Sequence, residues 1–310
     1  MTAFPRWKYV KREVEYVVTE WVVIPMKIIV RNKKALVGLI IVLGYIIMAT
    51  IGPEVVPYPR SYQYPKYIKP TIFRWPPSLE HPLGTDYFGA DIWAKIVWGS
   101  RPVLTITFIT GLITTTIGVV IGLTAGFLGG LVDMVLMGIT DILMTIPGLP
   151  LLIVLATLIR ASDPVTIGLI LSITAWTGLA RSIRSAVLSL KNAEFVEAAK
   201  ALGMPFWHII FREIMPNLMS FITVNFIFAA IGAIYGSIGL YFLGILPFTE
   251  FNWGVMLNMA YAQAGAHASL DTIHYILAPI GAIIGLQLGL LLLSYAVDEI
   301  FNPRLRTEVK

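Results

Sequence analysis

Six long stretches of this chain contain no Asp, Glu, Lys or Arg, and they constrain its fold more than any other feature. They cover residues 35–51, 102–128, 142–159, 164–180, 214–249 and 275–297. A transmembrane helix needs about 20 predominantly apolar residues, and about 17 still suffice, so each run is long enough to cross a bilayer. The sequence therefore predicts an all-α, polytopic helical membrane protein with six transmembrane helices.

The composition excludes a water-soluble enzyme of this length. Charged residues make up 13% of the 310 residues, against about 25% in soluble domains, and hydrophobic residues make up 57%. There is no cysteine, which excludes a disulfide framework, a thiolate metal site and a Cys nucleophile. The first apolar run is interpreted as a retained membrane span, because no small-residue cleavage pattern follows it.

Glycine and proline divide the apolar runs. The fifth run is too long for one straight span, so we expect its helix to end near Gly239 and the remainder to fold against the outer face. Pro147 and Pro150 predict a kink in the third run. Glycines recur every fourth residue in the second and sixth runs, which predicts that both helices are closely packed interior helices. In the second run these glycines are Gly118, Gly122 and Gly126, with Gly130 just after the run. In the sixth run they are Gly281, Gly285 and Gly289.

The distribution of basic residues predicts the orientation. Most of the 23 Lys and Arg residues lie in residues 1–34, in residues 181–213 and in the tail 302–310. Lys and Arg are retained on the cytoplasmic side, and six spans place these three segments on one side, so both termini are predicted to be cytoplasmic. The chain then divides into four parts. These are a cytoplasmic segment 1–34, a first span with an external Pro- and Tyr-rich segment over 35–100, a core of five spans over 101–301 and a cytoplasmic tail 302–310.

Catalytic and metal-binding motifs are absent from the sequence. The four histidines show no metal-ligand spacing, and neither a nucleotide-binding G-x-x-x-x-G-K-[ST] nor a G-x-S-x-G motif occurs. Three aromatics that we place on the outer side, Tyr241, Trp253 and Tyr261, have two interpretations. They could stack on sugar rings or belong to an interfacial aromatic belt, and we favour the belt.

One ionisable residue at the third run, Asp141, also has two interpretations. It could belong to a substrate or proton path, or it could brace helix ends by pairing with Arg181 or Arg184. We favour the second interpretation, because a proton relay usually needs several such groups and this chain shows one.

The 33 residues from Arg181 to Glu213 form the only long polar stretch between apolar runs on the predicted cytoplasmic side. Helix-forming residues from Glu194 to Leu202 predict one short helix, and Gly203 is a natural left-handed C-cap. Pro205 can start a second short helix, too short to span, in its first turn. An exposed Phe206–Trp207 pair on that helix calls for a partner groove or for the bilayer interface.

This stretch resembles the E-A-A loop of ABC importer permeases. Glu197, Ala198 and Ala199 are followed after three residues by Gly203, and twelve further residues lead to Pro216. The segments 81–86 (HPLGTD), 253–257 (WGVML) and 302–306 (NPRLR) resemble the C-type subunit of the dipeptide, oligopeptide and nickel import branch, which also includes archaeal oligosaccharide permeases. The chain departs from the usual pattern at Ala90, Glu213 and Met215.

The resemblance implies a type I ABC importer permease fold in the plasma membrane and a subunit that is not itself catalytic. It implies a homologous second permease, two cytosolic ATP-binding subunits that carry ATP and Mg²⁺, an extracytoplasmic substrate-binding protein and a surrounding of membrane lipid. It implies no cofactor on this chain and no nucleic acid. Within the coupling loop 181–216, the residues implied to meet an ATPase groove are Glu197, Ala198, Ala199, Gly203, Met204, Pro205, Phe206, Trp207 and Pro216.

The substrate stays open at this point between peptides, oligosaccharides and nickel. A proton-coupled secondary transporter or a membrane enzyme is the alternative from another class. The transporter would need more buried titratable groups and an inverted internal repeat, which the sequence does not show at sight, and the enzyme would need a catalytic cluster.

Overall fold

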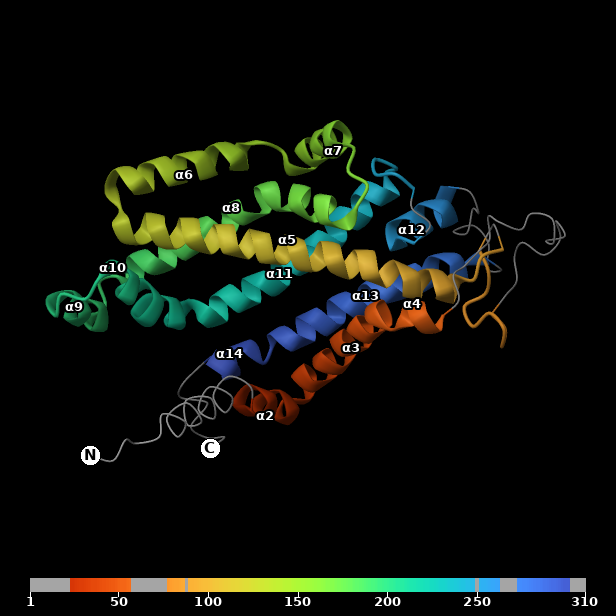
Figure 1. Cartoon of the computed structure of the whole chain (residues 1–310), viewed down its shortest axis with the longest axis horizontal. Helices are drawn as coiled ribbons and strands as arrows, with labels where there is room; N and C mark the ends of the chain where they lie inside the picture. Colours follow the sequence, from red (N-terminus) through yellow and green to blue (C-terminus); the bar gives the residue numbers. More distant parts are fainter. Residues whose placement is uncertain (1–22, 57–76, 87–88, 249–250, 263–271, 302–310) are drawn as a thin grey trace, which may run out of the picture.

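A computed structural model of the chain describes residues 23–56, 77–86, 89–248, 251–262 and 272–301. Within these ranges the regular elements are helices, and the bundle is elongated along the direction of its longest helices (Figure 1). Residues 1–22 of the predicted cytoplasmic segment 1–34, residues 57–76 of the predicted external segment, residues 263–271 and the tail 302–310 lie outside the described residues.

Five helices of the described chain are each long and apolar enough to cross a membrane, and one bent pair gives a sixth candidate if it is counted as one span. The five are α3 (Lys33–Thr50), α5 (Ile92–Leu128), α8 (Pro164–Leu190), α13 (His274–Ser294) and a continuous helix over Phe206–Phe242 that ends as α11 (Met215–Phe242). The pair is α6 (Gly130–Thr145) and α7 (Gly148–Ile159), bent by 88°. The prediction of six spans is confirmed with α6 and α7 counted as one.

The third crossing differs from its prediction in where it begins. Its helix starts at Gly130 rather than at residue 142, because Gly129 and Gly130 take positive φ values of 66° and 55° and turn the chain directly from α5 into α6. The predicted break occurs at Pro147, which lies between the two helices. Pro150 lies in the first turn of α7, where its missing N–H costs no helical hydrogen bond. Asp133 and Asp141 therefore lie inside α6.

The fifth crossing is longer than predicted at both ends. Its helix passes through Gly239 and ends at Phe242, where Gly244 takes a φ of 70° and donates to the Tyr241 carbonyl (3.0 Å). The next helix, α12 (Trp253–Ala262), has ten residues and is too short to span a bilayer. Its first four residues are buried at the end of the bundle, where the Trp253 indole donates to the Ile96 carbonyl (3.1 Å).

Two of the three aromatics placed on the outer side belong to the core. Tyr241 is 2% exposed and Trp253 is 0% exposed. The interpretations that these two side chains stack on sugar rings or belong to an interfacial belt are therefore wrong. Of the three aromatics, Tyr261 alone, 55% exposed, fits either interpretation.

Helix α5 is the central helix, and its glycines face α8. A Cβ at Gly118, Gly122 or Gly126 would lie 2.6–2.9 Å from atoms of Leu179, Ala180, Ile183 or Val187. Gly130 stands outside this contact. The interior position of the second run is confirmed.

The sixth run is interior on one side, where Tyr275, Ala282, Ile283 and Leu286 of α13 belong to a buried cluster with side chains of α5, α11 and α12. Helix α13 packs mainly against α3, where Gly38 meets the Gly289 carbonyl and Gly285 meets Tyr45. A Cβ at Gly281 would meet nothing within 4 Å. Helix α13 therefore lies between α3 and the rest of the bundle, and Gly285 and Gly289 of its repeat both face α3.

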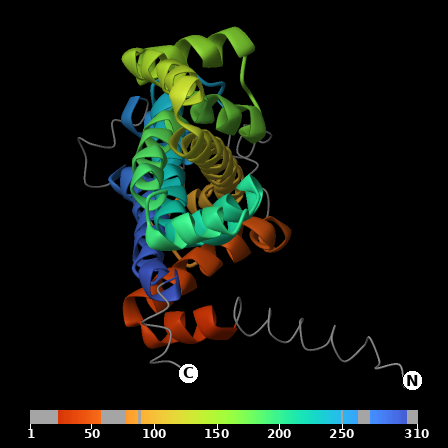
Figure 2. The same ribbon diagram turned by 90° about the vertical axis from the view of Figure 1, so that its left-hand side faces the viewer.

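The described elements gather at two opposite ends of the bundle. Helices α2 (Ile24–Arg31), α9 (Glu194–Ala201), α10 (Phe206–His208) and α14 (Val297–Phe301) lie at one end, which we call the loop end. Helices α4 (Gly52–Val55) and α12 lie at the other, which we call the α12 end (Figures 1 and 2). The three basic segments were predicted to lie on one side of the membrane, and the described helices agree with this. Helix α2 belongs to segment 1–34, α9 belongs to segment 181–213, and α14 directly precedes the tail 302–310.

Short polar contacts hold the α12 end together. Asp91 caps α5 by accepting from the Ala94 amide (2.8 Å), and its other oxygen meets His81 Nδ1 (2.8 Å). Asp86 pairs with Lys95 at 2.5 Å. Asp163 caps α8, and the hydrogen bonds that it accepts from Thr166 hold its pKa below the ordinary value of an aspartate.

Candidate functional site

The predicted coupling segment contains one short amphipathic helix, α9. Val196 and Ala199 point inward and are buried against Ile209, Ile210 and Ile214. Glu197 and Ala198 are exposed. The Glu-Ala-Ala sequence therefore divides between two faces: its glutamate and first alanine are available to a partner, and its second alanine belongs to the core.

The turn after α9 has the left-handed geometry that the sequence predicted. Gly203 takes a φ of 69° and donates to the Lys200 carbonyl (3.0 Å), and the Met204 amide donates to the Ala199 carbonyl (3.1 Å). A Cβ at Gly203 would meet nothing within 4 Å. Glycine is needed here for its backbone conformation and not for space.

The second helix of the segment is not the short, separate helix that was predicted. Pro205 lies at its N-cap, and α10 continues through a π-helix, η3 (Ile209–Ile214), into the membrane helix α11. Helix α8 also runs on to Leu190, so the connecting segment is only about 191–205. The exposed Pro216, in the first turn of α11, lacks the N–H that a regular helix would use there. The coupling segment is thus continuous with a membrane span.

The Phe206–Trp207 pair separates into one inward and one outward side chain. Phe206 is half-buried and meets the Phe127 ring edge-on, with 5.2 Å between ring centroids. Trp207 is 65% exposed and stacks on the exposed Phe211, with 5.9 Å between centroids and 19° between ring planes. The prediction that both side chains are exposed is therefore wrong for Phe206 and right for Trp207.

Large apolar side chains are exposed together at this end of the chain. We call them the docking face; its members are Phe195, Leu202, Met204, Trp207 and Phe211. Phe195 and Leu202 were not singled out from the sequence. They are the apolar residues of α9 and its C-cap that fall outside the buried stripe of Val196 and Ala199, and helical periodicity could have identified them.

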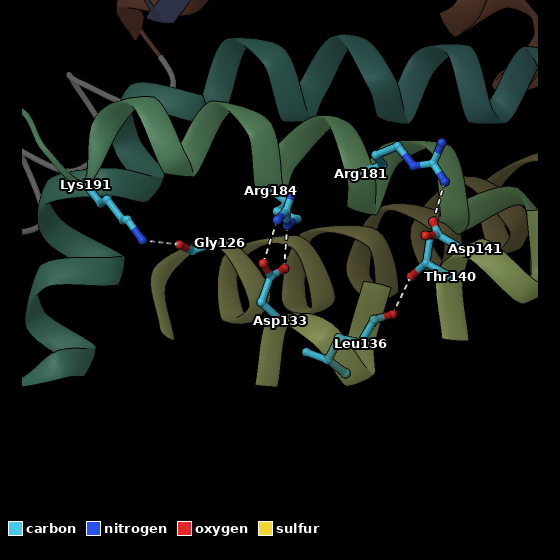
Figure 3. A network of polar contacts seen from close by, with 8 residues as sticks. All are labelled: Gly126, Asp133, Leu136, Thr140, Asp141, Arg181, Arg184 and Lys191. Atoms are coloured by element: carbon cyan, nitrogen blue, oxygen red, sulfur yellow. Dashed lines mark hydrogen bonds and ion pairs between the residues drawn. The ribbon is translucent and has the colours of Figure 1, made fainter. Parts of the chain in front are cut away.

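Three polar contacts tie the C-terminal part of α8 and its C-cap Lys191 to the adjoining helices (Figure 3). Arg184 pairs with Asp133 through both carboxylate oxygens, Arg181 pairs with Asp141, and Lys191 donates to the Gly126 carbonyl (3.3 Å). The Arg184–Asp133 pair is the more buried, with side-chain exposures of 31% and 17%, against 52% and 59% for Arg181 and Asp141. These contacts keep α6 in place beside α8 close to the docking face.

Arg181 and Asp141 form the ion pair that the helix-bracing interpretation of Asp141 requires. That Asp141 is not essential for transport stays a prediction. We expect Asp141→Asn to keep at least half of the substrate uptake of the wild type, because the amide oxygen can still accept from Arg181. The measurement is uptake by the assembled transporter in proteoliposomes. Asp133→Asn is the matched contrast, and we expect it to lower thermal stability more, because it leaves the half-buried Arg184 without its charge partner. Complete loss of uptake by an assembled Asp141→Asn complex would favour the proton-path interpretation instead.

Metal-binding clusters are not found in the described part of the chain, where no three His, Asp or Glu side chains converge. His267 lies outside that part.

Comparison with known proteins relates the chain to membrane transport subunits. Residues 118–307 match the family model described as binding-protein-dependent transport system inner membrane component, and residues 26–77 match the N-terminal TM domain of oligopeptide transport permease C. The chain is 36% identical over 231 residues to the dipeptide transport system permease protein DppC of Bacillus subtilis, covering 74% of this chain and 70% of that protein. It is 32% identical over 276 residues to the oligopeptide transport system permease protein OppC of the same organism, covering 89% and 87%. The corresponding OppC of Haemophilus influenzae is 34% identical over 238 residues, covering 75% and 74%.

Proposed function

Because the chain belongs to the family of binding-protein-dependent transport system inner membrane components, and is thus an ABC importer permease, we propose that it carries peptides and meets its ATPase subunit through the docking face. The observation that carries the coupling proposal is the exposed cluster of Phe195, Leu202, Met204, Trp207 and Phe211 beside Glu197. A soluble partner with an apolar groove would bury this cluster, and a cation on that partner would pair with Glu197.

The peptide proposal draws on the relatives. Proteins named dipeptide and oligopeptide permeases match this chain over most of both sequences. We therefore favour peptides over oligosaccharides and nickel. The full transporter would contain this chain, a homologous second permease, two ATP-binding subunits that hold ATP and Mg²⁺, and an extracytoplasmic binding protein.

The coupling mechanism follows from the continuity of α10, η3 and α11. Closure of the ATPase dimer on ATP would move the docking face, and the helix from Phe206 to Phe242 would carry that movement into the membrane without a flexible joint. Helix α8 would follow, because Ile183 and Val187 share a buried cluster with side chains of η3 and α11. Helix α6 would follow α8 through its ion pairs with Arg184 and Arg181. The movement is a rigid-body change between two states, biased by nucleotide at one end and by the loaded binding protein at the other.

Peptide transport is tested with the complete transporter reconstituted in proteoliposomes. We expect ATP-dependent uptake of trialanine and no uptake of maltotriose or Ni²⁺ under the same conditions. Uptake that proceeds in a preparation of this permease without ATPase subunits, driven by a proton gradient, would support the secondary transporter instead. Uptake of maltotriose in place of trialanine would overturn the peptide proposal and leave the permease assignment intact.

We also propose that the loop end faces the cytoplasm, because the basic residues Lys27, Lys33, Lys34, Lys191 and Lys200 gather there. The absence of natural cysteine makes the test clean. Single cysteines in place of Ser61 and Ser269 should react with an impermeant maleimide added to intact cells, whereas cysteines in place of Lys191 and Thr307 should react only after the membrane is opened. External labelling at position 191 would reverse the orientation and remove the basis of the coupling proposal.

A further inference from the structure

A cavity of about 490 Å³ lies among α5, α7, α8 and α11, away from the docking face. Thr110 and Thr114 of α5 line it from inside the chain, where both are buried. Ala175 of α8 and Phe228 of α11 lie at its exposed rim. Its volume falls in the range of about 300–1,000 Å³ that is typical of sites for small organic ligands.

One polar group in this cavity has no partner among the described residues. The Thr114 hydroxyl is buried, with the residue 2% exposed, and makes no hydrogen bond to the described chain. The neighbouring Thr110 differs, because its hydroxyl donates to the Gly168 carbonyl (3.0 Å). A buried hydroxyl without a partner costs free energy, so the Thr114 hydroxyl is suited to a ligand that enters the cavity.

The other polar groups of the lining are also uncharged. Thr174 of α8 supplies a hydroxyl, and Asn225 of α11 supplies a side-chain amide. The amide nitrogen of Asn225 donates to the Phe221 carbonyl (2.8 Å), which orients the side chain while its oxygen takes no part in that bond. None of the described residues that line the cavity is ionisable.

A lining of hydroxyl and amide groups on an apolar wall can bind neutral amides, but it supplies no counterion for a charged side chain. Building on the proposed peptide transport, we infer that this cavity is a substrate subsite that holds the main chain of a peptide through Thr114, Thr174 and Asn225. Selection at this subsite does not depend on the charge of the peptide side chains. The main-chain amide is present in every peptide whatever its side chains, and the lining matches it.

The test uses the complete transporter in proteoliposomes and three tripeptides: trialanine, alanyl-lysyl-alanine and alanyl-glutamyl-alanine. Thr114→Val, which keeps the shape and removes the hydroxyl, should lower uptake at subsaturating peptide by about 3- to 10-fold, the effect of one lost buried hydrogen bond. Asn225→Leu should have an effect of the same size. The ratio of variant to wild-type uptake should be equal for the three peptides, and taking this ratio cancels any preference of the binding protein.

Two further variants keep the test decisive. Ala175→Trp fills the cavity from its rim and should lower uptake at least 10-fold in complexes that still contain their ATPase subunits. Thr124→Val is the matched control on α5, because its exposed hydroxyl donates to its own helix at Val120 (2.6 Å), and it should leave uptake unchanged.

The outcomes separate the subsite from the function on which it rests. If the wild type takes up all three peptides and Thr114→Val does so equally well, the cavity is not a subsite and the peptide proposal stands. If Thr114→Val and Asn225→Leu lower uptake of only the charged peptides, recognition of the main chain is wrong. If the wild type takes up none of the three, the peptide proposal fails and the subsite fails with it.

Discussion

Gly122→Leu is expected to prevent α5 and α8 from packing and to cause a large loss of stability. A Cβ at Gly122 would lie 2.6 Å from the Ala180 carbonyl oxygen and 2.6 Å from Ile183 Cβ. The first of these is a backbone atom in the middle of a membrane helix and cannot move aside alone. The two helices must separate, and the contacts at Gly118 and Gly126 are lost with them. Overpacking of this kind typically costs about 1–3 kcal/mol and occasionally more.

The measurement is the thermal midpoint of the detergent-solubilised protein, followed by size-exclusion chromatography after heating. We expect the thermal midpoint to fall by at least about 5 °C, or no folded protein to be recovered. A destabilisation of about 3 kcal/mol would have this effect, because each kcal/mol lowers the midpoint by about 2–4 °C. Gly44→Leu is the matched control, because Gly44 also lies in a membrane helix and a Cβ there would meet nothing within 4 Å. Equal midpoints for the two variants would show that the α5–α8 contact does not need glycine.

Substitutions on the docking face are expected to abolish coupling without unfolding the chain. Trp207→Asp places a charge at the centre of an apolar surface that is 65% exposed at this position, so the free chain tolerates it while a docked ATPase subunit does not. Gly203→Val forces a β-branched residue into a left-handed conformation at a cost of about 1–2 kcal/mol, with no crowding around it. Each variant should weaken attachment of the ATPase subunits and lower binding-protein-stimulated ATP hydrolysis at least 10-fold.

Conservative variants at the same positions separate docking from folding. Trp207→Phe keeps an aromatic surface, and Gly203→Asn places there a residue that visits the left-handed region readily, so both should retain most of the stimulated hydrolysis. Phe206→Asp would not discriminate, because Phe206 packs on Phe127 and its loss disturbs the fold. Full stimulated turnover by Trp207→Asp and Gly203→Val complexes would contradict the assignment of this surface as the coupling site.

The number of spans could be predicted from the sequence, because a bilayer requires uncharged runs of a fixed minimum length. The ends of the spans could not, because hydropathy reports where lipid lies and not where a helix ends. Helix α8 continues for ten residues past its apolar run, since Arg181 and Arg184 pair with Asp141 and Asp133 of α6 instead of ending the helix. Pairings across 40 and 51 residues are not visible in local patterns.

The turn at Gly203 was predictable because its signal is local: a helix-forming stretch, a glycine and then a proline. The continuation of the next helix into α11 was not, because η3 is a π-helix whose side chains do not repeat with the α-helical period. The glycine repeats of α5 and α13 look alike in the sequence. Only the tertiary fold shows that the repeat of α5 packs against α8 and that of α13 against α3.

The π-helix has a consequence for how this family can change by insertion and deletion. A π-helix fits an extra residue into a helical turn, and one residue corresponds to about 100° of rotation in a regular α-helix. Residues 209–214 therefore fix the angular phase between Trp207 on the docking face and Asn225 on the wall of the cavity. Deleting one residue there would leave both surfaces intact and still connected, but would point them in directions that no longer match their partners.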